Sequence, residues 1–254
     1  MRRFINEKDS IIEYLDERFY QSIDIDGNEF YVPSVTHILD VAYSKGYAYE
    51  QWLKDVGNNA KIIGDRAKES GSKVHNACYE LLSGALLNNE SEIYTLEEWK
   101  GIIGFTEFMT FVDKVYGFEK NLIGNLWGGT LDLACSINEE DYIIDYKFGN
   151  AVYDNYYLQL IAYKILADEF YKKDFKIAIL WLKANTRGER KGLIQGQGWQ
   201  IKYPDDDYEI LKKVWKSVLE IYKFKNPISK PSNLIYPMKL QLNLEGRNDT
   251  NVSS

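Results

Sequence analysis

Several residue types are scarce in this chain, and each shortage excludes a class of protein. The 254 residues include two cysteines, Cys78 and Cys135, which are too few and too far apart for a disulfide framework. No stretch of about 18 uncharged apolar residues occurs, and the chain starts without an apolar signal region, so we expect no membrane span and no export. These absences predict a soluble protein of the cytoplasm.

Apolar and aromatic side chains, in contrast, are plentiful. They make up 45% and 15% of the sequence, which at this length is enough to bury a sizeable core as one domain. No linker rich in proline or serine divides the chain, and we find no internal repeat. One folded domain is therefore the simplest interpretation.

Two short apolar runs, residues 131–135 and 142–144, are rich in β-formers and predict a β-hairpin. Asp132 lies in the first run, and Asp145 and Lys147 follow the second. Residues two apart in a strand share a face, so Asp145 and Lys147 point the same way, and the partner strand brings Asp132 to the same edge. Two carboxylates this close repel each other unless a hard divalent cation lies between them. The pattern therefore predicts a site for Mg²⁺ or Mn²⁺.

Taken alone, an Asp-x-Lys pair is more often a solvated strand edge. Here the pair follows an apolar run, where a charge is costly unless it is paired or bound to metal. The next segment, residues 155–166, has apolar residues at three- and four-residue steps and predicts a helix. Gln159 and Tyr163 project from one face of that helix, as functional groups or as ordinary rim residues. His75 follows Gly71 in what reads as the first turns of another helix, where a single histidine is more often a core or surface residue than a ligand.

Together these residues resemble the PD-(D/E)xK nuclease superfamily and, within it, the RecB-like exonuclease branch, which includes mitochondrial, phage and CRISPR-associated exonucleases. The resemblance runs from about Tyr20 to Tyr163. Leu131 stands where the superfamily name expects proline, and the second acidic position is Asp145 rather than a glutamate. The matching residues are Pro33-Ser34-Val35-Thr36, Gly71 with His75, Gly129-Thr130-Leu131-Asp132, Asp145-Tyr146-Lys147, and Gln159 with Tyr163.

This resemblance implies an α/β (α+β) fold with a restriction-endonuclease-like core. We expect a central mixed β-sheet flanked by helices, preceded by an N-terminal hairpin and a helical lobe. One nuclease domain would span residues 1–240, with the hairpin and helical part at 18–125 carrying His75 and the catalytic core at 126–230. A flexible tail would follow at 241–254.

The resemblance also implies a metal site. His75, Asp132, Asp145 and the backbone carbonyl of Tyr146 would bind Mg²⁺ or Mn²⁺. Glu119 resembles the acidic residue that these enzymes often carry ahead of the first motif. The two cysteines of the chain exclude the four-cysteine iron–sulfur cluster of the CRISPR-associated relatives.

The catalytic residues implied are Asp132, Asp145, Lys147, Gln159 and Tyr163. The lysine would orient or help deprotonate the attacking water and offset charge in the transition state. The glutamine would support the site, and the tyrosine would donate a hydrogen bond near the scissile phosphate or the lysine.

The function expected from the resemblance is that of a divalent-metal-dependent DNA exonuclease. It would hydrolyse phosphodiester bonds in single-stranded DNA or at DNA ends, in recombination, repair or phage DNA processing. A structure-specific or restriction-like endonuclease is the runner-up, because the exonuclease assignment depends on His75 and the branch alone. A non-catalytic subunit with a nuclease fold is a third reading. The nucleotide-binding loop Gly-x-x-x-x-Gly-Lys-Ser/Thr is missing from the sequence, so a helicase or recombination partner would be a separate protein.

The formal charge of −7 is unusual for a DNA-binding protein, which ordinarily offers phosphate a basic surface. Part of that acidity belongs at the metal site, where a bound cation reverses its sign. Basic residues also cluster locally, as solvated faces or as a track for DNA. The clusters are Lys172, Lys173 and Lys176; Lys183, Arg187, Arg190 and Lys191; and Lys223, Lys225 and Lys230.

Periodicity predicts the remaining elements. Residues 19–32 alternate around Asp26-Gly27, which indicates a hairpin with a two-residue turn. Ser34 or Thr36 can cap a helix that follows. We further expect helices over residues 49–67, 99–115 and 205–224, and paired strands over 175–182 and 198–202.

Overall fold

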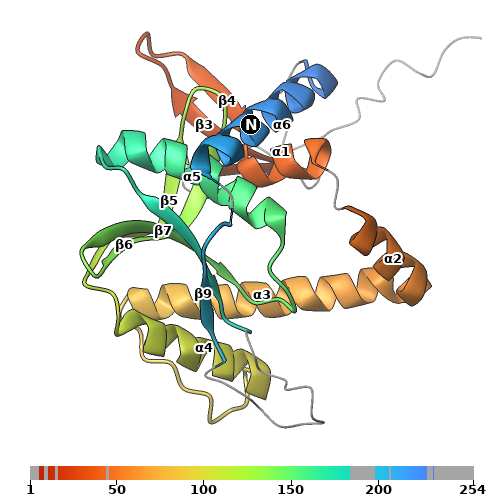
Figure 1. Cartoon of the computed structure of the whole chain (residues 1–254), viewed down its shortest axis with the longest axis vertical. Coiled ribbons are helices and arrows are strands. Elements are labelled where there is room, and N and C mark those ends of the chain that lie inside the picture. Colours follow the sequence, from red (N-terminus) through yellow and green to blue (C-terminus); the bar gives the residue numbers. More distant parts are fainter. Residues whose placement is uncertain are drawn as a thin grey trace, which may run out of the picture.

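A computed structural model shows a mixed α/β protein whose five-stranded sheet is flanked by helices (Figure 1). It describes residues 6–8, 11–14, 17–43, 46–183, 198–205, 207–227 and 231. The expected tail at 241–254 lies outside these residues, as do Arg187, Arg190, Lys191 and Lys230 of the basic clusters. Among the described helices, none has the length and apolar character needed to cross a membrane.

The five-stranded sheet has the order β5-β6-β7-β8-β9 and is mixed. β5 (Lys114–Ile123), β6 (Gly128–Ile137) and β7 (Glu140–Lys147) form an antiparallel meander. The chain then crosses through a helix to β8 (Lys176–Trp181), which runs parallel to β7, and β9 (Gln200–Lys202) pairs antiparallel with β8. The expected mixed sheet is thus present, and the predicted strands at 175–182 and 198–202 are confirmed as a pair.

The β6–β7 hairpin predicted from the two apolar runs is confirmed. Ile137 pairs with Glu140, so Asn138 and Glu139 form a two-residue turn, with φ values of +50° and +65°. Positive φ at both central residues is typical of the primed turns that match the right-handed twist of paired strands. β6 and β7 are buried on both faces, which explains why their sequences are nearly continuous apolar runs.

Helices cover both faces of this sheet (Figure 1). α1 (Val35–Ala42), α5 (Asp154–Tyr171) and α6 (Tyr208–Lys225) pack on one face, in a core that includes Ile143 of β7. On the other face α3 (Ala60–Leu82) and α4 (Leu96–Met109) form a second core with the next residue along the strand, Ile144. Alternation along β7 thus supplies each core with every second side chain. The helices predicted at 155–166 and 205–224 are confirmed as α5 and α6.

A second, four-stranded antiparallel sheet precedes the first. Its strands β3 (Glu17–Ile23) and β4 (Glu29–Pro33) confirm the predicted N-terminal hairpin. The predicted two-residue turn is wrong, because residues 24–28 form a longer loop in which the N–H of Asp24 donates to the carbonyl of Asn28 at 2.9 Å. Two further strands of this sheet, β1 (Asn6–Lys8) and β2 (Ile11–Tyr14), were not predicted from the sequence.

Ser34 connects this small sheet to the central one. It forms a parallel bridge with Gly128 at the start of β6. Its side chain also accepts a hydrogen bond from the N–H of His37 at 3.1 Å and so caps α1, as one of the two predicted caps. The end of β4, the start of α1 and the start of β6 are therefore fixed together.

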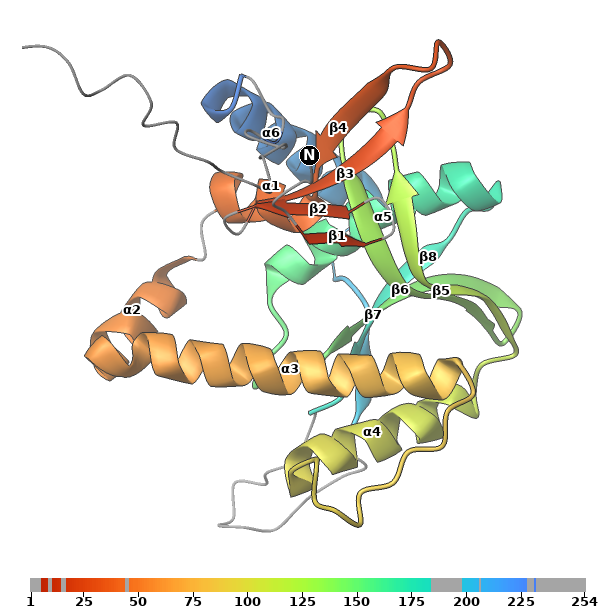
Figure 2. The same cartoon turned by 180° about the vertical axis from the view of Figure 1, so that it is seen from behind.

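The helical part differs from the prediction in its boundaries. The single helix expected over 49–67 is divided into α2 (Gly46–Val56), a 3₁₀ turn (Gly57–Asn59) and the long α3 (Ala60–Leu82), and Gly57 has a φ of +53° that a helix does not accommodate. α2 lies at the outer end of α3, away from the sheets (Figure 2). His75 consequently lies deep within α3 and not in its first turns.

The boundaries predicted for the helix over 99–115 were also wrong at both ends. α4 (Leu96–Met109) begins three residues earlier because Thr95 and Glu98 form a capping box, in which the N–H of each residue donates to the side chain of the other. It ends earlier because residue 114 already starts β5. β5 was not predicted from the sequence, and it proves to be part of the candidate site.

Candidate metal centre and its lysine

The β6–β7 hairpin positions the first acidic residue. Regular pairing ends at Leu133 and Ile144, so Asp132 and Asp145 follow at adjoining positions. Beyond this point the N–H of Tyr146 donates to Asp132 Oδ2 at 2.8 Å. One oxygen of Asp132 is thus held by the backbone of the neighbouring strand, and the other, Oδ1, faces His75.

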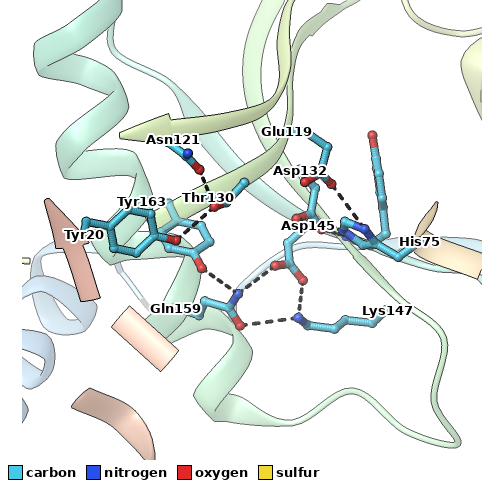
Figure 3. A network of polar contacts seen from close by, with 11 residues as sticks. Tyr20, His75, Glu119, Asn121, Thr130, Asp132, Asp145, Lys147, Gln159 and Tyr163 are labelled. Carbon is cyan, nitrogen blue, oxygen red and sulfur yellow. Dashed lines mark hydrogen bonds and ion pairs between the residues drawn. The ribbon is translucent and has the colours of Figure 1, made fainter. Parts of the chain in front are cut away.

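His75, Glu119 and Asp132 form a compact group. His75 Nε2 lies 3.1 Å from Asp132 Oδ1, and His75 Nδ1 lies 3.2 Å from Glu119 Oε1 (Figure 3). One ligand atom from each residue lies within 4.8 Å of the other two. The three residues come from α3, β5 and β6, so the fold brings together side chains that are far apart in the sequence.

Glu119 reaches this group through an unusual backbone. Its neighbours Phe118 and Lys120 pair with Leu133 and Leu131, which places Glu119 across from Asp132. Its φ is +45°, a left-handed value in the middle of a strand. Such a conformation costs about 1–3 kcal/mol in a residue other than glycine and is concentrated at functional sites. The strain is therefore a second sign, besides the short distances, that Glu119 belongs to the site.

The predicted catalytic residues also meet, in a network next to this group. Lys147 Nζ forms an ion pair with Asp145 Oδ2 at 2.6 Å, and Gln159 Nε2 donates to Asp145 Oδ1 at 3.0 Å. Lys147 Nζ donates to Gln159 Oε1 at 3.3 Å. Gln159 Nε2 also donates to the hydroxyl of Tyr163 at 3.1 Å, so the helix face predicted from their four-residue spacing is confirmed (Figure 3).

Of the four expected metal ligands, His75 and Asp132 belong to the compact group. Asp145 lies outside the compact group, because Lys147 and Gln159 engage its two oxygens. Tyr146 contributes a backbone N–H to Asp132, and its carbonyl as a ligand stays a prediction. The third member of the group is Glu119, for which the sequence indicated only a likeness to an acidic residue of the family.

The side chains of the site become more exposed from Asp145 to His75. The Asp145 side chain is 2% exposed and that of Asp132 10%. The Lys147, Glu119 and His75 side chains are 21%, 27% and 31% exposed. A solute would therefore reach the site from the side of His75 and Glu119, with Asp145 as its floor.

The charges of the site are strongly coupled. Burial alone would lower the pKa of His75, but the neighbouring carboxylates, led by Asp132, raise it to about 9. Burial would raise the pKa of Asp132, yet the imidazolium of His75 holds it below its ordinary value. Burial is also the largest cause for Asp145 and raises its pKa to about 6 against the attraction of Lys147. The pKa of Lys147 is raised, because Asp145 and Asp132 outweigh its burial.

This electrostatic pattern fits a divalent cation. Three carboxylates and one ammonium leave an excess of two negative charges, which a protonated His75 can reduce but not cancel. A cation with two charges and a neutral imidazole ligand would cancel it. The 3.1 Å between His75 Nε2 and Asp132 Oδ1 is close to the roughly 3 Å that separates neighbouring ligand atoms around an octahedral Mg²⁺. The donor set of one imidazole and carboxylates suits Mn²⁺ as well.

The glycines that precede Asp132 have a steric role. A Cβ on Gly129 would lie 2.2 Å from Cε1 of Tyr163, and one on Gly128 would lie 2.7 Å from Cγ of Tyr20. Both rings therefore pack directly on the backbone of β6. This brings the Tyr163 hydroxyl to Gln159.

Tyr20 and Asn121 are polar residues of this region that the sequence analysis did not assign. The Tyr20 hydroxyl and Thr130 Oγ1 lie 2.9 Å apart, and Thr130 Oγ1 donates to Asn121 Oδ1 at 2.6 Å. The chain of contacts runs from the small sheet across β6 to β5 (Figure 3). It fixes the two strands that carry Asp132 and Glu119 relative to one another.

No protein-family model matches this chain, and a search of curated proteins also found no match. The residues of the site and their arrangement are therefore the basis for assigning a function. The fold is mixed α/β. Among the described residues, His75, Glu119 and Asp132 could hold a divalent cation, and Lys147 forms an ion pair with Asp145 beside them.

Proposed function

We propose that this chain is a divalent-metal-dependent DNA nuclease that hydrolyses phosphodiester bonds and acts as an exonuclease at strand ends. The observation that carries the proposal is the compact group of His75, Glu119 and Asp132 beside the ion pair of Asp145 and Lys147. A purely structural network would gain little from so many carboxylates around one imidazole, because buried charges are costly to desolvate.

His75 and Asp132 would hold the Mg²⁺ or Mn²⁺, with Glu119 either as a third ligand or as the carboxylate that orients His75 through Nδ1. When bound, the metal would neutralise charge on the phosphate and make water a better nucleophile. Asp132 itself is fixed for this role by the N–H of Tyr146.

Lys147 would stabilise negative charge that develops on the phosphate and would orient the attacking water. Its ammonium is already held in place by Asp145 and Gln159, so little reorganisation is needed when substrate binds. The raised pKa of Lys147 keeps it protonated at neutral pH, which favours charge stabilisation over proton abstraction. Tyr163 would hold Gln159 through the hydrogen bond between them.

We also propose that the central sheet is a restriction-endonuclease-like core, within one domain of residues 1–240. The mixed sheet, the crossover through α5 and the acidic residues on adjoining strands β6 and β7 support this assignment. Two parts of the proposal, that the substrate is DNA and that cleavage occurs at strand ends, rest on the resemblance of the motifs. A helicase or recombination protein would supply unwinding from a separate chain.

End-labelled DNA provides the decisive test. Purified protein would be incubated with linear single-stranded and duplex DNA, with circular single-stranded DNA and with end-blocked DNA, in Mg²⁺, Mn²⁺ or a chelator. We expect metal-dependent loss of linear DNA, and a rate that is about 10²–10³-fold lower in Lys147→Ala. The matched control is Lys176→Ala, which removes another lysine paired with a carboxylate, that of Glu140, at the opposite end of the β7–β8 pair.

Each result separates the candidate functions. Cleavage of circular DNA would favour an endonuclease. No cleavage in either metal, or full activity of Lys147→Ala, would overturn the proposal. A non-catalytic subunit need show no rise in melting temperature when Mg²⁺ or Mn²⁺ is added, whereas a site of this kind should show one.

A further inference from the structure

Lys147 has a third neighbour besides Asp145 and Gln159. Its Nζ lies 4.7 Å from the centre of the Tyr156 ring, within the range of a cation–π contact. Tyr156 stands on the first turn of α5, one turn before Gln159. Two residues of the same helix therefore hold the ammonium, one through an amide oxygen and the other through the face of a ring.

Tyr156 in turn packs against a more exposed tyrosine. The rings of Tyr153 and Tyr156 are 5.6 Å apart and nearly perpendicular, at 81°. The N–H of Tyr156 donates to the carbonyl of Tyr153 at 3.0 Å, which fixes the backbone between them. Tyr153 is 54% exposed, and its side chain makes no capping hydrogen bond to α5. Its burial contributes little to folding, so its ring is available to a ligand.

The ligand chemistry follows from what surrounds these rings. A helix N-terminus ordinarily attracts phosphate, but Asp154 places a carboxylate in the first turn of α5 and disfavours an anion there. An exposed aromatic face beside an acidic residue suits a planar, uncharged group. In a polynucleotide that group is the base, and a base stacks on a side chain only when it is free of its duplex neighbours.

We propose that Tyr153 and Tyr156 form a base-stacking subsite for an unpaired nucleotide next to the metal centre. Tyr153 stacks on the base, and Tyr156 acts as a positioning residue that keeps the Lys147 ammonium against its ring. The subsite deepens the proposed nuclease function and rests on it for the identity of the substrate. It selects single strands or frayed ends, and it tolerates any sequence, because every base has a face to stack.

Equilibrium binding of a fluorescent single-stranded oligonucleotide tests the role of Tyr153 without requiring cleavage. We expect Tyr153→Ala to weaken binding about tenfold and Tyr153→Trp to retain it, because stacking depends on ring area. Duplex binding should change little. Equal affinity of wild type and Tyr153→Ala for the single strand, or equal losses for both DNA forms, would overturn the subsite.

The role of Tyr156 is tested by a pair of variants. Tyr156→Phe keeps the ring face over Lys147, and Tyr156→Leu removes it. If the ring positions the ammonium, Leu lowers kcat at nearly unchanged KM and Phe restores it. Because Tyr156 also packs on the core, kcat is compared at a temperature where circular dichroism shows all three proteins to be folded. A Phe variant as slow as Leu, or a Leu variant as fast as wild type, contradicts this role.

The two proposals can fail separately. If wild type cleaves DNA and Tyr153→Ala binds normally, the subsite is wrong and the nuclease stands. If wild type binds single strands through Tyr153 but cleaves nothing in Mg²⁺ or Mn²⁺, the subsite stands as a binding site and hydrolysis is wrong. If wild type does not bind the oligonucleotide, the subsite is wrong whatever the metal centre does.

Discussion

Two lysines, Lys147 and Lys164, each lie against carboxylates in this protein, and their surroundings differ. Lys164 of α5 forms ion pairs with Asp168 at 2.6 Å and with Asp174 at 2.5 Å, and its side chain is 2% exposed. Lys147 pairs with Asp145 at 2.6 Å and is 21% exposed. The lysine at the candidate site is therefore the more accessible one, while its carboxylate partner is the more deeply buried.

The carboxylates account for this difference. Around Lys164 the excess negative charge reaches water, because Asp174 is 96% exposed. Asp168 also accepts a hydrogen bond from the N–H of Phe175 at 2.9 Å, so this network joins the end of α5 to the start of β8. Around Lys147 the excess charge is buried and faces His75. We infer that the first network stabilises the fold and that the second is arranged to receive a cation.

Lys147→Ala should have the largest effect on activity. We expect kcat to fall by about 10²–10³-fold, the range observed when one preorganised donor is removed from a site. The melting temperature should fall only modestly, because Asp145, with a pKa of about 6, can take up a proton when its partner is lost. Nuclease assays and thermal melts of the same preparation would measure both. If Lys147→Ala melted far below wild type, Lys147 would be a structural lysine like Lys164, and the contrast between them would be lost.

Lys164→Met should have the opposite effects, a large loss of stability and no loss of activity. Removing the ammonium leaves Asp168 and Asp174 facing each other, and we expect the free energy of unfolding to fall by about 2–3 kcal/mol. The specific activity of the folded fraction should match wild type, since Lys164 lies outside the site. Urea unfolding followed by circular dichroism, with an activity assay at low temperature, would measure the two quantities. An inactive but stable Lys164→Met protein would contradict this assignment.

Glu119→Gln tests the metal centre and its strained residue. It keeps the shape of the side chain and removes its charge, so we expect the affinity for Mn²⁺ to fall about 10–100-fold. Isothermal titration of Mn²⁺ would measure this, with Glu139→Gln as the control. Glu139 also has positive φ, but it lies in the β6–β7 turn. Equal Mn²⁺ affinity of Glu119→Gln and wild type would exclude Glu119 from the site.

The sequence was sufficient to predict those helices and strands that depend on the residue pattern within one segment of the chain. Two short apolar runs rich in β-formers predicted the hairpin that carries Asp132, Asp145 and Lys147. The four-residue spacing of Gln159 and Tyr163 predicted that they share a helix face. The restriction-endonuclease-like assignment and the nuclease activity go beyond what these patterns fix and stay proposals.

The parts that were missed depend on the tertiary fold. β5 mixes charged and apolar residues, and its pairing with β6 shifts register between Val115 and Gly117, so no regular alternation marks it as a strand. Glu119 is placed by a left-handed backbone that nothing in the residue type predicts. His75 was recognised, but its position deep in α3 was missed, because its helix was expected to start near Gly71 and α3 instead runs through this glycine from Ala60 to Leu82.

The smallest predicted effect is the pH dependence of the structural network. Hydrogen bonding to Lys164 is the largest cause that holds the pKa of Asp174 below its ordinary value of 3.8. A carboxylate with a lowered folded pKa contributes stability above its unfolded pKa, and that contribution is lost as the pH falls through the folded value. Because Asp174 is exposed, the contribution should be about 0.5 kcal/mol or less.

Asp174→Asn removes this titration without changing the size of the side chain. The variant should therefore melt slightly below wild type near neutral pH, and the two curves should converge as the pH falls towards about 2. A difference that persists in acid would show that Asp174 acts through packing or neutral hydrogen bonds. The charge on Asp174 would then not stabilise the connection between α5 and β8. In that case the networks of Lys147 and Lys164 would differ in burial and not in electrostatics.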